Sequence, residues 1–234
     1  MTRLAILPLF AAVAFSQLAP EPTRVMSSKT ETSAFPSGGV LHVGKSSGEL
    51  TIEAWDKSDL ELTVNTRSKR PVSGDERKRA EDAIGKVKVS LETKGDTISV
   101  STDVPKEHRY KSFDGAPTLF EVDYRIRVPR NARLVVDDHS GEVHIEGVRG
   151  DIDARVREGE IALHLPEKGT YAVDARSKFG NVTSDFPGDE MHRWWRTTHF
   201  MNATPQSPAQ KLKLRVGYGD VVILAERVPA IVAH

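Results

Sequence analysis

A short unit centred on glycine recurs along this chain and constrains its fold more than any other feature. Each copy has Gly, then Asp, Glu or Asn, then an apolar residue, a variable residue and a mostly apolar residue. Alternation of this kind after a glycine is typical of a half-buried β-strand that follows a tight corner. The copies have their glycines at Gly48, Gly141, Gly150, Gly159, Gly180 and Gly219.

The spacing of these glycines favours a stack of short strands. Gly141, Gly150 and Gly159 follow one another at intervals of nine residues, and two such steps are within reach of one coil of a solenoid. A unit with two inward apolar residues cannot bury its own face, whereas stacked copies would form a continuous core. We therefore predict an all-β fold, a right-handed β-solenoid or β-helix-like stack of short strands with one α-helix in the N-terminal half. By the same spacing, the intervals 159–180 and 180–219 predict about one and two further coils, and each acidic residue is expected to bond the amides of its own turn.

The rest of the chain divides around this array. Residues 38–118 are predicted to form a β-rich part, with a hairpin that turns at residues 94–96 and a helix at 75–85. For the helix, Ser73 and Glu76 have the spacing of a capping box, and Ala80, Ala83 and Ile84 share one helical face. The repeats are predicted to fill residues 119–234, apart from an insertion at 187–210.

The N-terminus has the pattern of a signal peptide. Arg3 precedes an apolar run at residues 4–15, and small residues near Ser16 predict cleavage after it, so residues 1–16 are assigned as signal peptide. The run is shorter than the roughly 20 residues of a membrane span, although an uncleaved N-terminal anchor is the alternative. Residues 17–37 are rich in Ser, Thr and Pro and predict a flexible leader. We expect an exported protein, periplasmic or at the cell surface, without a transmembrane span in its mature form.

The composition of the chain excludes several classes of function. The sequence has 33 Lys and Arg against 33 Asp and Glu, so no global field favours nucleic acid as a partner. It contains no Cys, which excludes disulfides and thiolate metal sites. Nucleophile-elbow, phosphate-loop and dinucleotide motifs are absent from the sequence. We predict no cofactor, no metal and no catalytic residue; His144 and His164 are expected on an outward polar row.

The insertion at 187–210 supplies the candidate partner-binding residues, which are His192, Trp194, Trp195 and Phe200. Adjacent tryptophans in an extended segment cannot both point into one core. The insertion is therefore either a loop that binds a partner, such as an envelope protein or a glycan, or a cap over the end of the core. Trp55 is expected to be a corner aromatic that covers the core, with sugar stacking as the alternative.

Two other functions remain open at this point. One is a carbohydrate-active β-helix enzyme, which would need groups such as Asp137, Asp138 and His139 to converge beside a groove. The other is an envelope sensor that contacts its ligand through Trp194 and Trp195.

The units at residues 47–52, 140–145 and 217–223, together with residues 124–129 before the array, resemble the bacterial DUF4097 family of adhesin-like proteins. The resemblance covers residues 38–224 and implies an exported, solenoid-like β domain without established catalytic residues. The chain departs from the family pattern in its Trp-containing insertion and at Ser184, where an apolar residue is expected. The resemblance therefore favours a non-enzymatic, adhesin-like or envelope binding or scaffold module.

Overall fold

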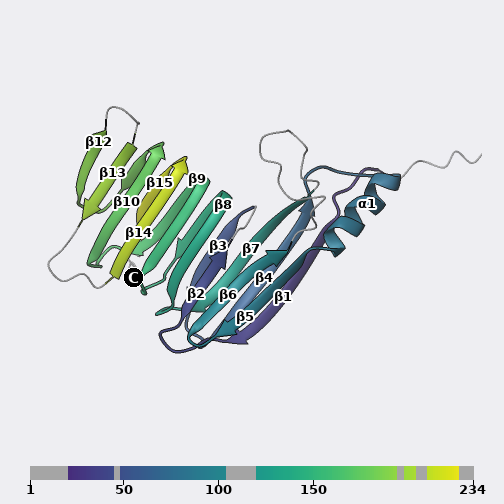
Figure 1. Cartoon of the computed structure of the whole chain (residues 1–234), viewed down its shortest axis with the longest axis horizontal. Coiled ribbons are helices and arrows are strands. Elements are labelled where there is room, and N and C mark those ends of the chain that lie inside the picture. Colours follow the sequence, from purple (N-terminus) through teal and green to yellow (C-terminus); the bar gives the residue numbers. More distant parts are fainter. Residues whose placement is uncertain (1–20, 45–47, 104–119, 194–197, 204–209, 227–234) are drawn as a thin grey trace, which may run out of the picture.

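The structure is a computed structural model that describes residues 21–44, 48–103, 120–193, 198–203 and 210–226. In these ranges the chain is mostly β-strand with one short helix, and the strands form a curled mixed sheet (Figure 1). The expected signal peptide at 1–16 lies outside the described residues. Within the described ranges, no helix combines the length and the hydropathy needed to cross a membrane.

The elements follow one another in the order β1 (Met26–Ala34), β2 (Val40–Gly44), β3 (Leu50–Trp55), β4 (Asp59–Ser68), α1 (Gly74–Gly85), β5 (Lys88–Lys94), β6 (Thr97–Asp103), β7 (Phe120–Pro129), β8 (Arg133–Glu146), β9 (Ile152–Pro166), β10 (Tyr171–Phe179), β11 (Val182–Ser184), β12 (Asp189–Arg193), β13 (Thr198–Ala203), β14 (Gln210–Tyr218) and β15 (Val221–Glu226). The hairpin expected around residues 94–96 is confirmed as β5 and β6, which pair antiparallel.

The long strands bend at a glycine, so that each has two arms. In β9 the buried positions before the bend end at Val156, and those after it begin at Ile161. This interval of five residues reverses the alternation, and both arms turn their apolar sides into one hydrophobic cluster. Strands β14 and β15 repeat this plan, with buried Val216 before the bend and Val221 after it. We call the part before the bend the first arm, the part after it the second arm, and the two together a coil.

The first arms and the second arms form two half-sheets. The first half-sheet contains β5, β6, β2, the first arms of β8 and β9, then β14, β10, β13 and β12. The second half-sheet contains β1, β4, β7, β3, the second arms of β8 and β9, then β15 and β11. Their buried sides face the common core and their other sides are outer faces.

Five of the six predicted corner glycines form a single row across the bends. A Cβ added at Gly141 would overlap the carbonyl oxygen of Gly48, and one at Gly159 would overlap that of Gly141. The same holds for Gly219 against Gly159 and for Gly180 against Gly219. Glycine is needed at Gly141, Gly159, Gly180 and Gly219 for two reasons. Their φ angles lie between 124° and 152°, and the stacked backbones leave no room for a side chain. The sixth, Gly150, lies at the return turn, where its Cβ would overlap the carbonyl oxygen of Ala132.

The order of the coils differs from their order in the sequence. Strand β14 pairs in parallel with β9 on one side and with β10 on the other, and β15 likewise lies between β9 and β11. The last coil of the sequence is therefore inserted between two earlier ones, as Figure 1 shows for yellow β14 beside green β9 and β10. The prediction of about two coils in the interval 180–219 was wrong, because this interval contains β11, the pair β12 and β13, and β14. Equivalent glycine units fix the length of a coil and not its neighbours.

At two corners the acidic residue bonds a neighbouring coil instead of its own turn. The backbone N of Asn181 donates to Oδ1 of Asp220 at 2.6 Å, and the backbone N of Lys211 donates to Oδ1 of Asp151 at 2.8 Å. A bend interrupts the ladder between parallel strands, so the nearest unpaired amide belongs to the adjacent strand. The predicted bonds within the turn are corrected accordingly at these two corners.

The N-terminal part contains one element that the composition concealed. Within the expected leader, 17–37, the segment Met26–Ala34 forms β1 and pairs antiparallel with β4 along its whole length. Its polar residues give no apolar period, since this edge strand is held by backbone hydrogen bonds and not by burial. Helix α1 confirms the prediction for 75–85, with Ala80, Ala83 and Ile84 buried. Ser73 takes the N-cap position without a side-chain hydrogen bond, so the expected capping box does not form.

The insertion at 187–210 contains a hairpin. Strands β12 and β13 pair antiparallel, and β13 pairs antiparallel with the free edge of β10. The insertion therefore extends the first half-sheet by two strands, an arrangement that neither the loop nor the cap interpretation described.

Candidate binding surface

Two of the four residues predicted to bind a partner lie in the new hairpin. His192 is opposite His199 in the register, whereas Phe200 is opposite Met191 on one side and Arg176 on the other. Because alternate positions of a strand belong to opposite faces, the hairpin places the two candidates at positions of opposite parity. Trp194 and Trp195 lie outside the described residues.

The groups required by the enzyme hypothesis do not converge. Asp137 is exposed on the outer side of β8, and its neighbour Asp138 is turned inward and only 5% exposed. Oδ1 of Asp138 accepts a hydrogen bond from the backbone N of His139 at 2.6 Å. Consecutive residues of a strand face opposite sides, so these carboxylates are separated by the sheet itself.

The outward position of the two histidines is confirmed. His144 lies opposite Ala162, and Glu146 lies opposite His164, on the outer side of the second half-sheet. The Nε2 atom of His144 lies 3.5 Å from Oε2 of Glu142. In the part of the chain that the structure describes, no three His, Asp or Glu side chains are grouped as metal ligands would be.

The outer side of the first half-sheet carries a concentration of positive charge. Along the first arm of β9 and along β14 and β10, the outward positions hold seven cationic residues and two acidic ones, Asp153 and Asp174. The chain as a whole has a formal net charge of zero. We call this surface the basic face; its cations are Arg155, Arg157, Arg176, Lys178, Lys211, Lys213 and Arg215.

Three arginines form a row across the middle of the basic face. Arg215 lies opposite Arg155 of β9 and opposite Arg176 of β10 in the parallel register. Neighbouring strands are about 4.8 Å apart, so the row extends over about 10 Å. The inward neighbours Ala154, Leu214 and Ala175 are fully buried, which fixes the backbone beneath the row.

The two carboxylates of the face partly neutralise four of its cations. Asp174 forms an ion pair with Arg215. Its Oδ1 also accepts a hydrogen bond from Nε of Arg176 at 3.1 Å. Asp153 contacts Lys213 at 2.9 Å and Arg155 at 3.5 Å. Each carboxylate carries one charge, so the group retains a positive surplus. Arg155 and Arg176 remain 56% and 51% exposed, and their side chains are accessible to a ligand.

An aromatic pair borders the basic face at the bend. The rings of Phe179 and Tyr218 stack with their centroids 4.7 Å apart and their planes at 15°. Both are unusually exposed, at 38% and 54%, and Nζ of Lys178 lies 5.3 Å from the Phe179 centroid. Exposed aromatic rings beside arginines are typical of recognition surfaces.

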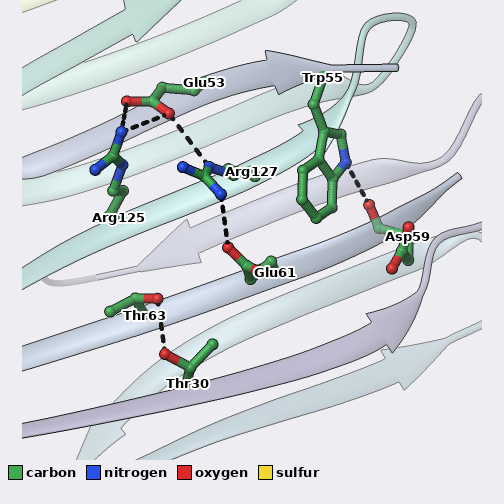
Figure 2. A network of polar contacts seen from close by, with 8 residues as sticks. All are labelled: Thr30, Glu53, Trp55, Asp59, Glu61, Thr63, Arg125 and Arg127. Carbon is green, nitrogen blue, oxygen red and sulfur yellow. Dashed lines mark hydrogen bonds and ion pairs between the residues drawn. The ribbon is translucent and has the colours of Figure 1, made fainter. Parts of the chain in front are cut away.

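A cross-strand row on the outer side of the second half-sheet is different, since its charges alternate in sign. Figure 2 shows Glu53 between Arg125 at 2.8 Å and Arg127 at 3.4 Å, and Arg127 in turn contacts Glu61 at 3.2 Å. Acid and base alternate along this cross-strand row and leave no surplus of one sign. The row braces β3, β7 and β4 against one another.

Trp55 belongs to this braced region. Its Nε1 donates to the carbonyl oxygen of Asp59 at 2.8 Å, as Figure 2 shows. Nζ of Lys57 lies 4.5 Å from the centre of its ring, and the Arg127 guanidinium lies 5.9 Å from it. Trp55 is half-buried at the end of β3, as expected of an edge or corner aromatic. It shares the outward parity of Glu53, and Ala54 is the neighbour that packs against the core, so the expectation that Trp55 covers the core was wrong.

An open cavity of about 310 Å³ adjoins Trp55. At its wall, Nε of Arg130 donates to Oδ1 of Asp56 at 2.6 Å. This hydrogen bond and the guanidinium charge lower the pKa of the Asp56 carboxyl. The pair thus resembles the other matched ion pairs of this side of the molecule.

Sequence reasoning overlooked the basic face although a signal was present. The runs Arg-Val-Arg at Arg155, Arg-Ser-Lys at Arg176 and Lys-Leu-Lys-Leu-Arg at Lys211 alternate cationic and smaller or apolar residues, as cationic outer sides of strands do. Their assembly into one surface depends on the placement of β14 between β9 and β10, which the sequence did not reveal.

Comparisons with known proteins add little to this description. No family model matches the chain, and no curated protein matches it. Among solved structures, it is similar to a candidate cell adhesion protein from Clostridium sporogenes, with 13% identity, a TM-score of 0.46, and coverage of 86% of this chain and 100% of that one. A candidate adhesin from Bacteroides fragilis has 11% identity and a TM-score of 0.26 over 87% of this chain and 99% of its own. At these identities and TM-scores, the similarities define neither a family nor an activity for this chain.

Proposed function

We propose that this chain is an exported, non-enzymatic binding module of the adhesin-like kind, a DUF4097-type right-handed β-solenoid that holds its basic face toward a partner in the cell envelope or at the cell surface. The observation that carries this proposal is the segregation of charge. The outer positions of the first arm of β9, of β14 and of β10 hold seven cations and two acids, whereas acid and base alternate in the row through Glu53 on the other half-sheet.

The basic face has the properties of a preformed interaction surface. Its arginines project from strands, and the inward neighbours Ala154 and Ala175 are fully buried. Little backbone freedom is lost when such a surface binds, so more of the contact energy appears as affinity. A local field of one sign also speeds encounter with an oppositely charged partner.

Export is supported by the signal-peptide pattern of residues 1–16 and by the absence of cysteine from the sequence. The hairpin β12–β13 extends the half-sheet that carries the basic face, and Phe200 lies at the register position next to Arg176.

Binding to isolated cell envelopes tests the proposal. The face variant combines Arg155→Gln, Arg157→Gln and Arg176→Gln. The charge-matched control combines Arg67→Gln, Arg77→Gln and Arg125→Gln, which removes the same charge from other surfaces. We expect wild-type protein and the control to sediment with envelopes and the face variant to remain in solution. Equal sedimentation of the two variants would contradict a role for the basic face.

A further inference from the structure

We infer that the basic face binds a linear acidic polysaccharide across its strands, through Arg155 and Arg176 at the two ends of the arginine row. Arg215 between them is 24% exposed, and its guanidinium donates to Asp174 and to two backbone carbonyl oxygens, so it contributes charge and not a paired donor. This inference rests on the proposed binding function and specifies the chemistry of the partner.

Two further carboxylates border the face, since Glu158 lies 3.8 Å from Arg157 and Asp137 lies opposite Arg155 in the register. Together with Asp153 and Asp174 they still leave the seven cations with a positive surplus, which favours an anionic ligand. Guanidinium groups bind carboxylate and sulfate through paired N–H donors, which favours a ligand that carries those groups.

The arrangement of the cations favours a polymer over a small anion. Along the row the cations recur at every strand, about 4.8 Å apart, and along β9 Arg157 follows Arg155 by two residues, or about 7 Å. The cations thus form a lattice on a flat sheet. The described cavities, including the 310 Å³ cavity beside Trp55, are lined by residues other than those of the basic face. A repeated charge on an extended chain can contact several points of such a lattice at once.

The two acids within the face identify hydroxyl groups as the second feature of the ligand. Asp153 and Asp174 lie in the row next to the arginine row, and the Asp174 side chain is 38% exposed. Carboxylates accept hydrogen bonds from hydroxyls and would repel a ligand with negative charge at every position. A sugar polymer supplies both hydroxyls and separated acidic groups, so it satisfies the acids and the arginines together.

The aromatic pair distinguishes this ligand from single-stranded nucleic acid. Proteins that bind single strands present separate aromatic platforms for successive bases. Here Phe179 and Tyr218 stack on each other, and Lys178 lies over Phe179. Rings stacked on each other offer no separate platforms for successive bases, whereas the exposed part of Tyr218 can contact the edge of a sugar chain.

Isothermal titration with defined polymers tests the inference. The probes are polygalacturonate for carboxylate, dextran sulfate for sulfate, neutral dextran, and single-stranded DNA. We expect binding to one or both acidic polysaccharides, weakening as salt is added, and no heat with neutral dextran. The face variant should bind about tenfold or more weakly, the equivalent of about 1.4 kcal/mol, and the control with Arg67, Arg77 and Arg125 replaced should remain close to wild type.

Three outcomes would overturn the inference. They are equal loss of affinity in the face variant and its control, tighter binding of DNA than of either acidic polysaccharide, and no binding of either polysaccharide. If the wild-type protein sediments with envelopes through the basic face but binds neither polysaccharide, the inference fails and the proposed function stands. If the face variant also sediments as well as its control, both fail. Circular dichroism and thermal unfolding of each variant show that it is folded.

Discussion

Gly219 lies directly against Gly159 in the next coil, so closely that a Cβ on Gly219 would overlap the Gly159 carbonyl oxygen. Gly180 lies against Gly219 in the same way on its other side. This contact joins the last coil of the sequence to β9 and, through Gly180, to β10 and β11. It therefore also brings Arg215 between Arg155 and Arg176 and assembles the basic face.

Replacement of Gly159 by alanine is expected to destabilise the fold strongly. Its φ of 140° is unfavourable for a residue with a Cβ, and the added atom would meet the Gly141 carbonyl oxygen. Strain together with overpacking should lower the free energy of unfolding by about 2 kcal/mol or more. Gly44→Ala is the matched control, because a Cβ there meets nothing within 4 Å, and should change it by less than about 0.5 kcal/mol. Equal effects of the two substitutions in urea denaturation would contradict the stacked row.

The bond between coils at Asp220 predicts a smaller loss. Asp220→Ala would leave the backbone N of Asn181 without its 2.6 Å acceptor, at a cost of about 1–2 kcal/mol. Glu142→Ala is the comparison at an equivalent corner, where the carboxylate contacts only the half-exposed His144 among the interactions seen. Chemical denaturation should separate the two variants by about 1 kcal/mol. Matching stabilities would show that Asp220 does not hold neighbouring coils together.

Tyr124 predicts a loss of stability at alkaline pH. Burial raises the pKa of its phenol to about 12, and its hydroxyl is hydrogen-bonded to Thr102. The folded state therefore keeps the proton longer than the unfolded state, whose tyrosine pKa is about 10. The stabilising contribution is complete below pH of about 10 and is lost as the pH rises toward 12. Urea denaturation over this range should show a fall in the unfolding free energy that Tyr124→Phe reduces; an unchanged pH profile in that variant would contradict the assignment.

Removal of strand β1 is expected to destabilise the fold. Removal of residues 1–34 would expose the hydrogen-bonding edge of β4, which β1 covers along nine residues. We expect lower stability and association through the open edge, measured by thermal unfolding and size-exclusion chromatography. Removal of residues 1–20 alone is the control. Identical elution and unfolding of the two shortened chains would be inconsistent with a structural role for β1.

Much of the local structure could be predicted from the sequence. The alternation after Gly141 and Gly159 identified half-buried strands, and the stripe of Ala80, Ala83 and Ile84 located the helix. These features depend on residues close together in the chain, whose spacing directly records which side is buried. Strand β1 escaped prediction because an edge strand of Ser, Thr, Lys and Glu has backbone pairing but no apolar period.

The candidate binding surface was harder to predict from the sequence than the local structure. The insertion drew attention to Trp194 and Trp195, which stand out in the sequence, while Arg155, Arg176 and Arg215 are ordinary outward residues of three strands. Their alternation with apolar neighbours was visible. Their proximity was not, because many different arrangements of the strands satisfy the same pattern.

The sequence by itself determined the repeated corner, the buried side of each strand and the single helix, because glycine conformation and apolar periodicity act over a few residues. Only the tertiary structure decided which coils are neighbours. That choice depends on backbone pairing between segments such as β9 and β14, which are distant in the chain, and similar glycine units allow several orders. The placement of β14 between β9 and β10 then converts three separate cationic strands into one surface, which is the physical basis of the proposed function.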